Sequence, residues 1–283
     1  MAFSKLKIWL VAATSFTVTF AANNSFNLTP FTIDLSSEIP RLNVLMNNTC
    51  LPATALYSGV GPDKGIELNL IAELRNEWPE IFDWETQQAE LNQFAQFTSV
   101  IEGQTVHFVH EKSKEADAIT GCQNVTEQRG TAFDTISNAY FMEQTTKPND
   151  IGFALYDSPV GQLAWIGGKM KLWSDPRAGT PPSVLNNTVI LTSVSLYYLT
   201  GSFLSSMWIY ASNPNGFHTV YLKVPMLFGQ YEYNIGLWLQ DYVTQVGNLV
   251  SYRVHNFGGN FAGLDNPPAL FDDIREMGLY FKV

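Results

Sequence analysis

Positively charged residues are scarce in this chain. Its 283 residues include 16 Lys and Arg against 26 Asp and Glu, which gives a formal net charge of −10. A surface that holds nucleic-acid phosphates needs clustered basic side chains. Because these are few and no run of like charges occurs, the composition argues against a nucleic-acid partner.

Cysteine and histidine are also scarce. Cys50 and Cys122 are the only cysteines; they could form one bridge in an oxidising compartment, but two cysteines do not make a disulfide framework. The four histidines show neither the HExxH nor the H-x-E spacing of zinc sites. No glycine-rich phosphate loop follows a predicted strand either. The sequence therefore predicts neither a metal nor a cofactor.

The N-terminal apolar run is too short to cross a bilayer. "IWLVAATSFTVTF" has about 13 residues, whereas a transmembrane helix needs about 20. Lys5 and Lys7 precede the centre of this run, and Ala21 and Ala22 follow it as small residues suited to cleavage. This order is typical of a secretory signal peptide. We therefore expect residues 1–21 to be a signal peptide, the protein to be secreted, and no stable insertion into a membrane.

Five N-x-[ST] sequons follow this signal. Single sequons arise often by chance, but five on a chain with a signal peptide predict a glycoprotein. The five acceptor residues are Asn23, Asn27, Asn47, Asn124 and Asn186.

Apolar spacing and turn residues divide the first part of the chain into four segments. Residues 30–52, punctuated by prolines, are predicted to be extended and rich in turns. Residues 64–80 carry apolar side chains at helical spacing and are predicted to form a helix. Residues 83–94 are predicted as a second helix, capped by Asp83, and residues 96–110 as a β-hairpin.

The rest of the chain is predicted to be a helical block followed by two strands and a closing helix. The predicted helices of the block span residues 136–147, 158–175, 183–203 and 203–211. The predicted strands span residues 224–233 and 248–254. Pro267 and Pro268 are expected near the first turn of the closing helix. Its apolar face is expected to carry Leu270, Ile274, Met277 and Phe281.

Several of these stretches resemble the epoxide hydrolases. "FDWETQQAELNQFAQFTSVIEGQTVHFVHEKS" (residues 82–113) is similar to the N-terminal region of that family. "AYFMEQTTKPNDIGFALYDSPVGQLAWIGGKMKLWSD" (residues 139–175) resembles its lid, and residues 191–210 resemble the later lid helices. "GGNFAGLDNPPALFDDIRE" (residues 258–276) is similar to the final turn and helix.

The similarity is collinear over most of residues 30–119 and 130–282. It implies an α/β protein: an incomplete α/β-hydrolase fold with an N-terminal helical arm and a helical lid, in which the central parallel strands are missing. The parts that the resemblance predicts are the epoxide hydrolase N-terminal region with the first β-hairpin (22–119), a junction loop (120–132), the lid (133–214), and the C-terminal strands and helix of the hydrolase core (215–283).

The resemblance also implies a mechanism and two site residues. In the family an Asp on a nucleophile elbow opens an epoxide, a His paired with an acid activates water, and two lid tyrosines donate hydrogen bonds to the epoxide oxygen. Tyr140, in "AYFMEQTTKP", and Tyr210, in "SSMWIYA", stand at the two donor positions. Without these flanking motifs each would be read as an ordinary core aromatic, because tyrosine packs well on helices.

The other catalytic parts depart from the family pattern. No H-G-W-P-G segment follows the hairpin, and a G-x-D-x-G match around Asp63 lies in a predicted turn instead of between a strand and a helix. The base position, His in "GGHF", is Asn260 in "GGNF", and an amide cannot take a proton. His255 would have to reach across the turn. The supporting acid is a weak assignment: Glu232 is the only carboxylate nearby, with Asn234 a second candidate for the position.

Several functions therefore stay open. The chain is expected to be an epoxide hydrolase relative with little or no activity. Alternatively, it is a truncated gene-model or splice product of an active secreted enzyme, or a non-catalytic protein that binds an apolar ligand; a working enzyme with relocated residues is least favoured. A small apolar epoxide is the only ligand implied, and the oligomeric state is left open. Because a parallel sheet needs helices on both faces, we expect poor folding alone, or a partial sheet capped by the lid.

Overall fold

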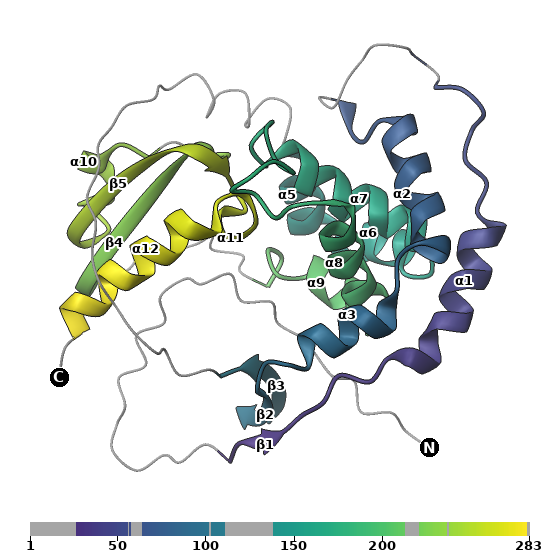
Figure 1. Cartoon of the computed structure of the whole chain (residues 1–283), viewed down its shortest axis with the longest axis horizontal. Coiled ribbons are helices and arrows are strands. Elements are labelled where there is room, and N and C mark those ends of the chain that lie inside the picture. Colours follow the sequence, from purple (N-terminus) through teal and green to yellow (C-terminus); the bar gives the residue numbers. More distant parts are fainter. Residues whose placement is uncertain are drawn as a thin grey trace.

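The structure, a computed structural model, covers most of the chain (Figure 1). The residues that it describes are 27–55, 57, 64–101, 103–110, 138–212, 221–236 and 238–281. Several predicted features lie outside these ranges: the signal peptide, Asn23, Asp63, Cys122, Asn124 and the junction of residues 120–132.

In the part of the N-terminal arm that the structure describes there are three α-helices, one more than predicted. α2 (Leu68–Glu80) and α3 (Trp84–Leu91) confirm the two expected helices. The Asp83 side chain caps α3, as expected, by accepting a hydrogen bond from the Glu85 N–H at 3.0 Å. α1 (Ile39–Asn48), which a 3-10 turn at Ser36–Glu38 precedes, contradicts the extended segment predicted for this region.

The prolines of the segment explain this error. Pro40 lies in the first turn of α1, where its missing N–H would have no helical acceptor in any case. Leu42 and Met46 follow at a spacing of four residues, and both are buried. One face of the segment therefore has the apolar period of a helix, and Pro40 marks where that helix starts.

The predicted β-hairpin is present and belongs to a small antiparallel sheet. β2 (Gln96–Ile101) pairs with β3 (Gln104–Val109). Gly103 turns between them at a φ of 77°, which glycine adopts without strain. β1 (Thr29–Pro30) pairs with the other edge of β2, so the strand order is β1-β2-β3.

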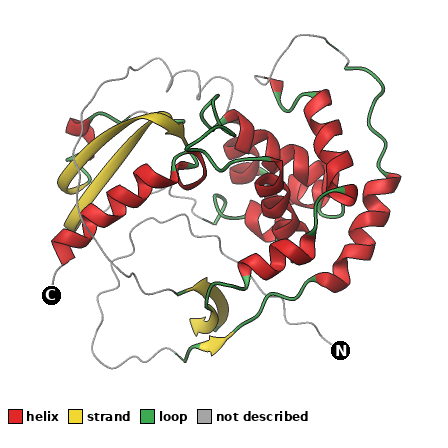
Figure 2. Ribbon diagram, viewed as in Figure 1, coloured by secondary structure: helices red, strands yellow, loops and turns green. Residues whose placement is uncertain are grey.

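Residues 138–212 of the described chain form a block of five helices, and Figure 2 shows these residues packed together with no strand among them. These helices are α5 (Ala139–Thr146), α6 (Pro148–Leu155), α7 (Pro159–Leu172), α8 (Asn187–Leu199) and α9 (Phe203–Met207). The core lies around α7 and α8, where Leu163, Ile190 and Val194 are fully buried. Trp78 ties the arm to this core, because its Nε1 donates a hydrogen bond to Ser195 Oγ at 3.0 Å.

The block differs from the prediction in two places. α6 was not predicted as a separate helix, and it begins at Pro148, which again occupies a first turn. The helix predicted to reach residue 211 ends at Met207. Tyr210 therefore lies in the turn that follows α9, a location that matters for the pocket described below.

The two strands predicted near the C-terminus form a second sheet. β4 (Leu222–Tyr233) and β5 (Gly247–Gly259) run parallel to each other. The helical elements of this region are α10 (Gln240–Val243), α11 (Ala262–Asp265), α12 (Pro267–Gly278) and a 3-10 turn (Leu279–Phe281). α12 crosses one face of the sheet, and in this view the helical block lies between the sheet and the helices α1 and α2 (Figure 1).

The face of α12 that meets the sheet is more polar than predicted. Ile274, expected on an apolar face with Leu270 and Met277, is 60% exposed, whereas Asp273 is only 3% exposed. The side chain of Phe281 lies outside the described residues. The described part of the chain is thus a mixed helix and sheet protein with a short parallel sheet.

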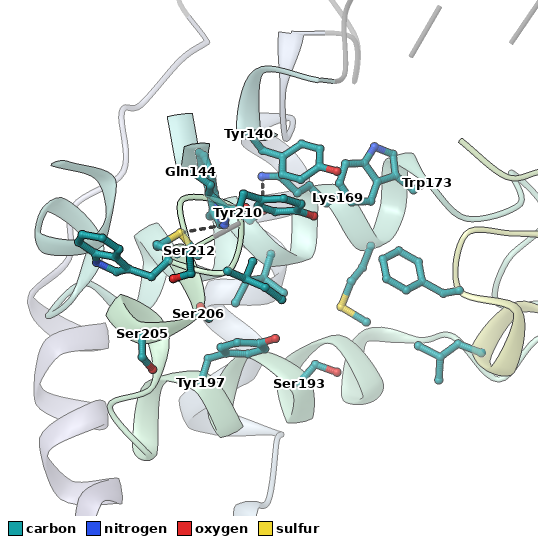
Figure 3. Close-up of a pocket in the computed structure, with 18 residues that line it drawn as sticks. Tyr140, Gln144, Lys169, Trp173, Ser193, Tyr197, Ser205, Ser206, Tyr210 and Ser212 are labelled. Atoms are coloured by element: carbon teal, nitrogen blue, oxygen red, sulfur yellow. Dashed lines mark hydrogen bonds between the residues drawn. The ribbon is translucent and has the colours of Figure 1, made fainter. Parts of the chain in front are cut away.

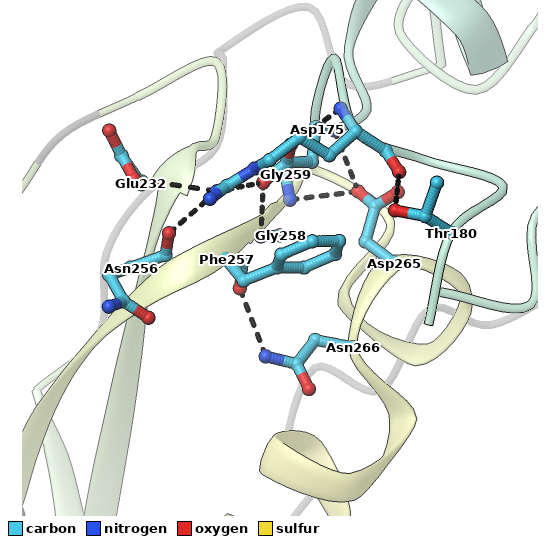
Figure 4. A network of polar contacts seen from close by, with 10 residues as sticks. Asp175, Thr180, Glu232, Asn256, Phe257, Gly258, Gly259, Asp265 and Asn266 are labelled. Atoms are coloured by element: carbon cyan, nitrogen blue, oxygen red, sulfur yellow. Dashed lines mark hydrogen bonds and ion pairs between the residues drawn. The ribbon is translucent and has the colours of Figure 1, made fainter. Parts of the chain in front are cut away.

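Two buried carboxylates lie where the end of β5 meets the segment after α7 (Figure 4): Asp175 belongs to that segment, and Asp265 ends α11. Asp265 Oδ2 accepts the Gly259 N–H at 2.8 Å, and Asp175 Oδ2 accepts the Gly258 N–H at 2.9 Å. Arg177 donates to both oxygens of Asp175, at 2.8 and 2.7 Å. Burial raises the pKa of Asp265. Burial also acts to raise the pKa of Asp175, but hydrogen bonds, first those from Arg177, outweigh it and lower that pKa.

Gly259 leaves no room for a side chain at this junction. A Cβ there would lie 2.4 Å from the Trp173 carbonyl oxygen and 2.9 Å from Asp265 Oδ2. We therefore expect Gly259→Ala to lower the free energy of unfolding by about 1–3 kcal/mol, as measured by urea unfolding followed by circular dichroism. Gly263→Ala is the matched control, since its Cβ would meet only Leu270 Cδ2, at 3.4 Å. Equal effects of the two substitutions would contradict a tight junction.

Candidate functional site

The two predicted donor tyrosines lie side by side. Tyr140 is in the first turn of α5, and Tyr210 is in the turn after α9. Their ring centroids are 5.9 Å apart in an edge-to-face arrangement at 71° (Figure 3). These distant parts of the chain meet because α6 packs against both α5 and α9.

The tyrosines line a cavity of about 620 Å³ (Figure 3). This volume falls within the range of about 300–1,000 Å³ that is usual for small-molecule pockets. The wall is mostly apolar and aromatic, and includes Trp165 of α7, Met207 of α9 and Phe261, which follows β5. Among the lining residues that the structure describes there is no Asp, Glu, His or Cys. No described carboxylate, imidazole or thiol therefore faces the cavity.

Burial keeps the Tyr140 hydroxyl protonated. Burial first, and then the hydrogen bond with Tyr210, raise the pKa of Tyr140 well above its usual value of about 10. Burial also raises the pKa of Tyr197, on the α8 wall of the same cavity. A neutral tyrosine hydroxyl can donate a hydrogen bond to a ligand oxygen. At neutral pH the pocket therefore offers donors on more than one wall.

Lys169 on α7 also lines this cavity, and no role was predicted for it from the sequence. Its Nζ donates to the Trp165 carbonyl oxygen at 2.8 Å, and it lies 3.6 Å from the centroid of the Trp165 ring and 5.8 Å from that of Tyr140. Burial lowers the pKa of Lys169 to about 8. One feature of the sequence could have indicated this contact: Trp165 and Lys169 are one turn apart on a largely apolar helix.

The predicted base position lies at the edge of the pocket. Asn260 directly follows β5, and its backbone N–H donates to the Trp173 carbonyl oxygen at 2.8 Å. The Trp173 ring lies 5.0 Å from Tyr140 and 6.4 Å from Phe261, centroid to centroid. The structure therefore brings the Asn260 turn and the tyrosine pair to one pocket wall. Asn260 itself is not among the residues that line the cavity.

His255, considered as a substitute base, faces α12 instead of the pocket. Its Nε2 lies 2.9 Å from Asp273 Oδ2, and its ring stacks on that of Tyr231 at 4.6 Å. Arg253 approaches the other oxygen of Asp273 at 3.2 Å. The sequence pattern gave no indication of this His–Asp pair, because α12 was expected to present an apolar face. The pair holds α12 to β5 and leaves His255 outside the cavity lining.

Glu232, the weak candidate for the supporting acid, lies at the junction between the sheet and the helical block. Its carboxylate is 3.6 Å from Arg177 Nη2, an ion pair that Figure 4 includes. Asn234, the second candidate, accepts the Ile235 N–H at 2.8 Å. Neither of these two contacts is with a histidine.

Three predicted glycan acceptors are described, and all three are exposed: Asn27, Asn47 and Asn186. The Asn186 Oδ1 accepts the Val189 N–H at 3.0 Å and caps α8. Cys50 is exposed, while its possible partner lies outside the described residues.

Within the described residues, no three His, Cys, Asp or Glu side chains come together as metal ligands would. No helix in the described part of the chain is both long and apolar enough to cross a membrane.

Comparison with known proteins identifies the relatives. Residues 28–120 match the family described as "Epoxide hydrolase N terminus". The chain is 34% identical over 147 residues to a putative epoxide hydrolase of Stigmatella aurantiaca, a match that covers 51% of this chain and 33% of that protein. It is 33% identical over 150 residues to juvenile hormone epoxide hydrolase 2 of Ctenocephalides felis, covering 48% of this chain and 32% of that protein. The chain thus spans about a third of the length of the curated relatives it matches.

Solved structures show the same fold. Aspergillus niger epoxide hydrolase superposes with a TM-score of 0.73 at 22% identity, over 90% of this chain and 96% of that one. Juvenile hormone epoxide hydrolase from the silkworm Bombyx mori superposes with a TM-score of 0.74 at 17% identity, over 90% and 94% of the two chains. The fold is therefore that of the α/β-hydrolases, in an incomplete form. Residues 28–120 match the N-terminal region of the epoxide hydrolases, and about half of the chain is similar in sequence to members of that family.

A buried ammonium should destabilise this fold near neutral pH. The pKa of Lys169 is about 8 in the folded protein and 10.5 without burial. We expect Lys169→Met to raise the free energy of unfolding at pH 7 by about 1–3 kcal/mol. Between pH 8 and 10.5 the unfolded state holds more protons than the folded state, so the wild type gains stability and the difference shrinks.

Urea unfolding of both proteins at several pH values on either side of 8 measures this difference. Lys171→Met, two residues further along α7 and outside the cavity lining, is the control and should show no such trend. A Lys169→Met protein that is less stable than the wild type at pH 7 would show that the ammonium is well compensated.

Proposed function

We propose that this chain binds a small apolar epoxide in the pocket between the lid helices without hydrolysing it. The observation that carries the proposal is the convergence of two tyrosine hydroxyls in an apolar cavity that no described carboxylate or imidazole faces. The curated relatives are epoxide hydrolases by name, and a ligand of that class is the one that such a pocket suits.

Binding follows from the two hydroxyl donors. An epoxide oxygen is a hydrogen-bond acceptor without a donor of its own, and the hydroxyls of Tyr140 and Tyr210 can each donate to it. The apolar wall then stabilises the rest of the ligand in proportion to the apolar area it buries.

Turnover would need groups that the pocket does not present. Opening the epoxide by the family reaction needs a nucleophile, and the second step needs a base within hydrogen-bond distance of water. Asn260 holds the base position and cannot take a proton. His255 pairs with Asp273 under α12, and Glu232 pairs with Arg177. The bound epoxide would therefore persist.

Binding and turnover can be measured separately. Titration of tryptophan fluorescence with a styrene-oxide-type epoxide should show saturable binding, because Trp165, Trp173 and Trp208 line the cavity. Chromatography of the same mixtures should show no diol above the buffer background. Tyr140→Phe and Tyr210→Phe should each weaken epoxide binding about three- to tenfold, the value of one hydrogen bond.

The controls separate hydrogen bonding from packing. Styrene, which lacks the epoxide oxygen, should bind the wild type and both variants alike. Tyr242→Phe removes an exposed hydroxyl on α10 and should change nothing. Diol formation that disappears in Tyr210→Phe would overturn the proposal, because it would show a working enzyme. Asn260→His alone should not create activity.

A second candidate is that the chain is a truncated gene-model or splice product of an active secreted epoxide hydrolase. The observation behind it is that the chain spans about a third of its curated relatives' length. Transcript reads that join codons 120 and 121 without a gap would remove this candidate. Under either candidate we propose that the chain is secreted and glycosylated, which the mass of the protein recovered from culture medium would test.

A further inference from the structure

The cavity contains one charged group among its described lining residues, the ammonium of Lys169. No Asp, Glu or Arg is among those residues. None of the ion pairs in the described part of the chain includes Lys169. A charge that leaves water for an apolar wall is stabilised only if it is paired and hydrogen-bonded, and this one has no carboxylate partner among the described residues.

The ammonium has hydrogen-bonding capacity to spare. A lysine carries three N–H donors, and the recorded hydrogen bond is the one to the Trp165 carbonyl oxygen. The ring of Trp165 also stabilises the charge, since Nζ lies 3.6 Å from its centroid. Because the pKa is about 8, roughly nine-tenths of Lys169 is protonated at pH 7. The pocket is therefore cationic near neutral pH despite its apolar wall.

The tyrosine hydroxyls lie on the same side of the pocket as this charge. Tyr140 is 5.8 Å from Nζ, measured to its ring centroid, and its ring centroid lies 5.9 Å from that of Tyr210. Figure 3 shows Lys169, Tyr140 and Tyr210 grouped together, with Tyr197 across the cavity in this view. One cation and two neutral hydroxyl donors together match the charge and the two acceptor oxygens of a carboxylate.

We propose that this pocket binds an apolar monocarboxylate, with its carboxylate on Lys169 and the tyrosine pair and its apolar chain along the aromatic wall. A monoanion fits because the described lining offers a single cation. The inference goes beyond the proposed function, since it requires no epoxide. It also supplies a counter-ion for the buried ammonium. That counter-ion would be the carboxylate of the ligand, because the described lining contains no acidic residue.

The test compares decanoate with decan-1-ol, which has the same chain and no charge. On the purified full chain at pH 7, tryptophan fluorescence or calorimetry should show decanoate binding at least tenfold more tightly than the alcohol. In Lys169→Met the ratio of the two affinities should fall to one or below. Lys169→Arg, which keeps the charge, should retain part of the preference, and Lys171→Met should retain all of it. Circular dichroism confirms that each variant is folded.

The pH dependence provides a second readout. The titratable residues of the described lining are Lys169, Tyr140, Tyr197 and Tyr210. Decanoate affinity in the wild type should be nearly constant between about pH 6 and 7, where the ligand is ionised and most of Lys169 is protonated, and should fall through pH 8 as Lys169 loses its proton. Burial raises the pKa of both Tyr140 and Tyr197, so these two stay neutral over that range. The same titration of Lys169→Met should be flat.

The outcomes separate this inference from the proposed function. Equal affinities of the wild type for acid and alcohol, or an acid preference that survives in Lys169→Met, would overturn the carboxylate site. Epoxide binding without decanoate binding overturns this inference alone. Decanoate binding that depends on Lys169, together with no epoxide binding, supports this inference and overturns the proposed function. Failure of every ligand to bind overturns both.

Discussion

The hydrogen bonds that Asp175 and Asp265 accept from the Gly258–Gly259 turn hold the two halves of the molecule together. Buried backbone N–H groups need acceptors, and a carboxylate is a strong one. Asp175 follows α7, so the bond that it accepts from Gly258 ties β5 to that segment. Asp265, in α11, accepts from Gly259 and also from the Asp175 N–H, at 3.3 Å, and so joins the same network. Trp173, two residues before Asp175, and Phe261, two residues after Gly259, both line the cavity. The pocket wall is therefore complete only while the junction is intact.

Local signals in the sequence predicted most of the fold. The helix capped by Asp83 and the hairpin that turns at Gly103 are both present, because capping and turn residues act over a few positions. The errors occurred where one type of residue is found in two kinds of local structure. Pro40 was read as an interruption but lies in the first turn of α1. The end of α9 was also missed, since the apolar residues after Met207 continue the helical spacing into a turn.

The site was predictable only in part. The resemblance located Tyr140 and Tyr210, and the structure brings them within one pocket. Whether they act as donors is a property of the ligand complex and stays a prediction. Lys169 and the His255–Asp273 pair had no sequence signal of comparable strength, because their environments are made by elements distant in the chain. Whether an ammonium or a carboxylate is buried depends on tertiary packing, and the spacing of residues along one helix does not reveal it.

The separation in sequence of the contacts across the junction has a consequence for how the chain folds. β4 and β5 pair residues about 25 positions apart, from Leu222 with Gly247 onward, whereas the bond from Gly258 to Asp175 closes a separation of 83 residues. Closing a longer loop costs more entropy and slows the contacts that depend on it. We expect the sheet and the helical block to form first and their joining to come last, which pulsed hydrogen exchange at the Gly258 and Gly259 amides would detect. A ligand that fills the cavity would then bind only chains that have completed this last step.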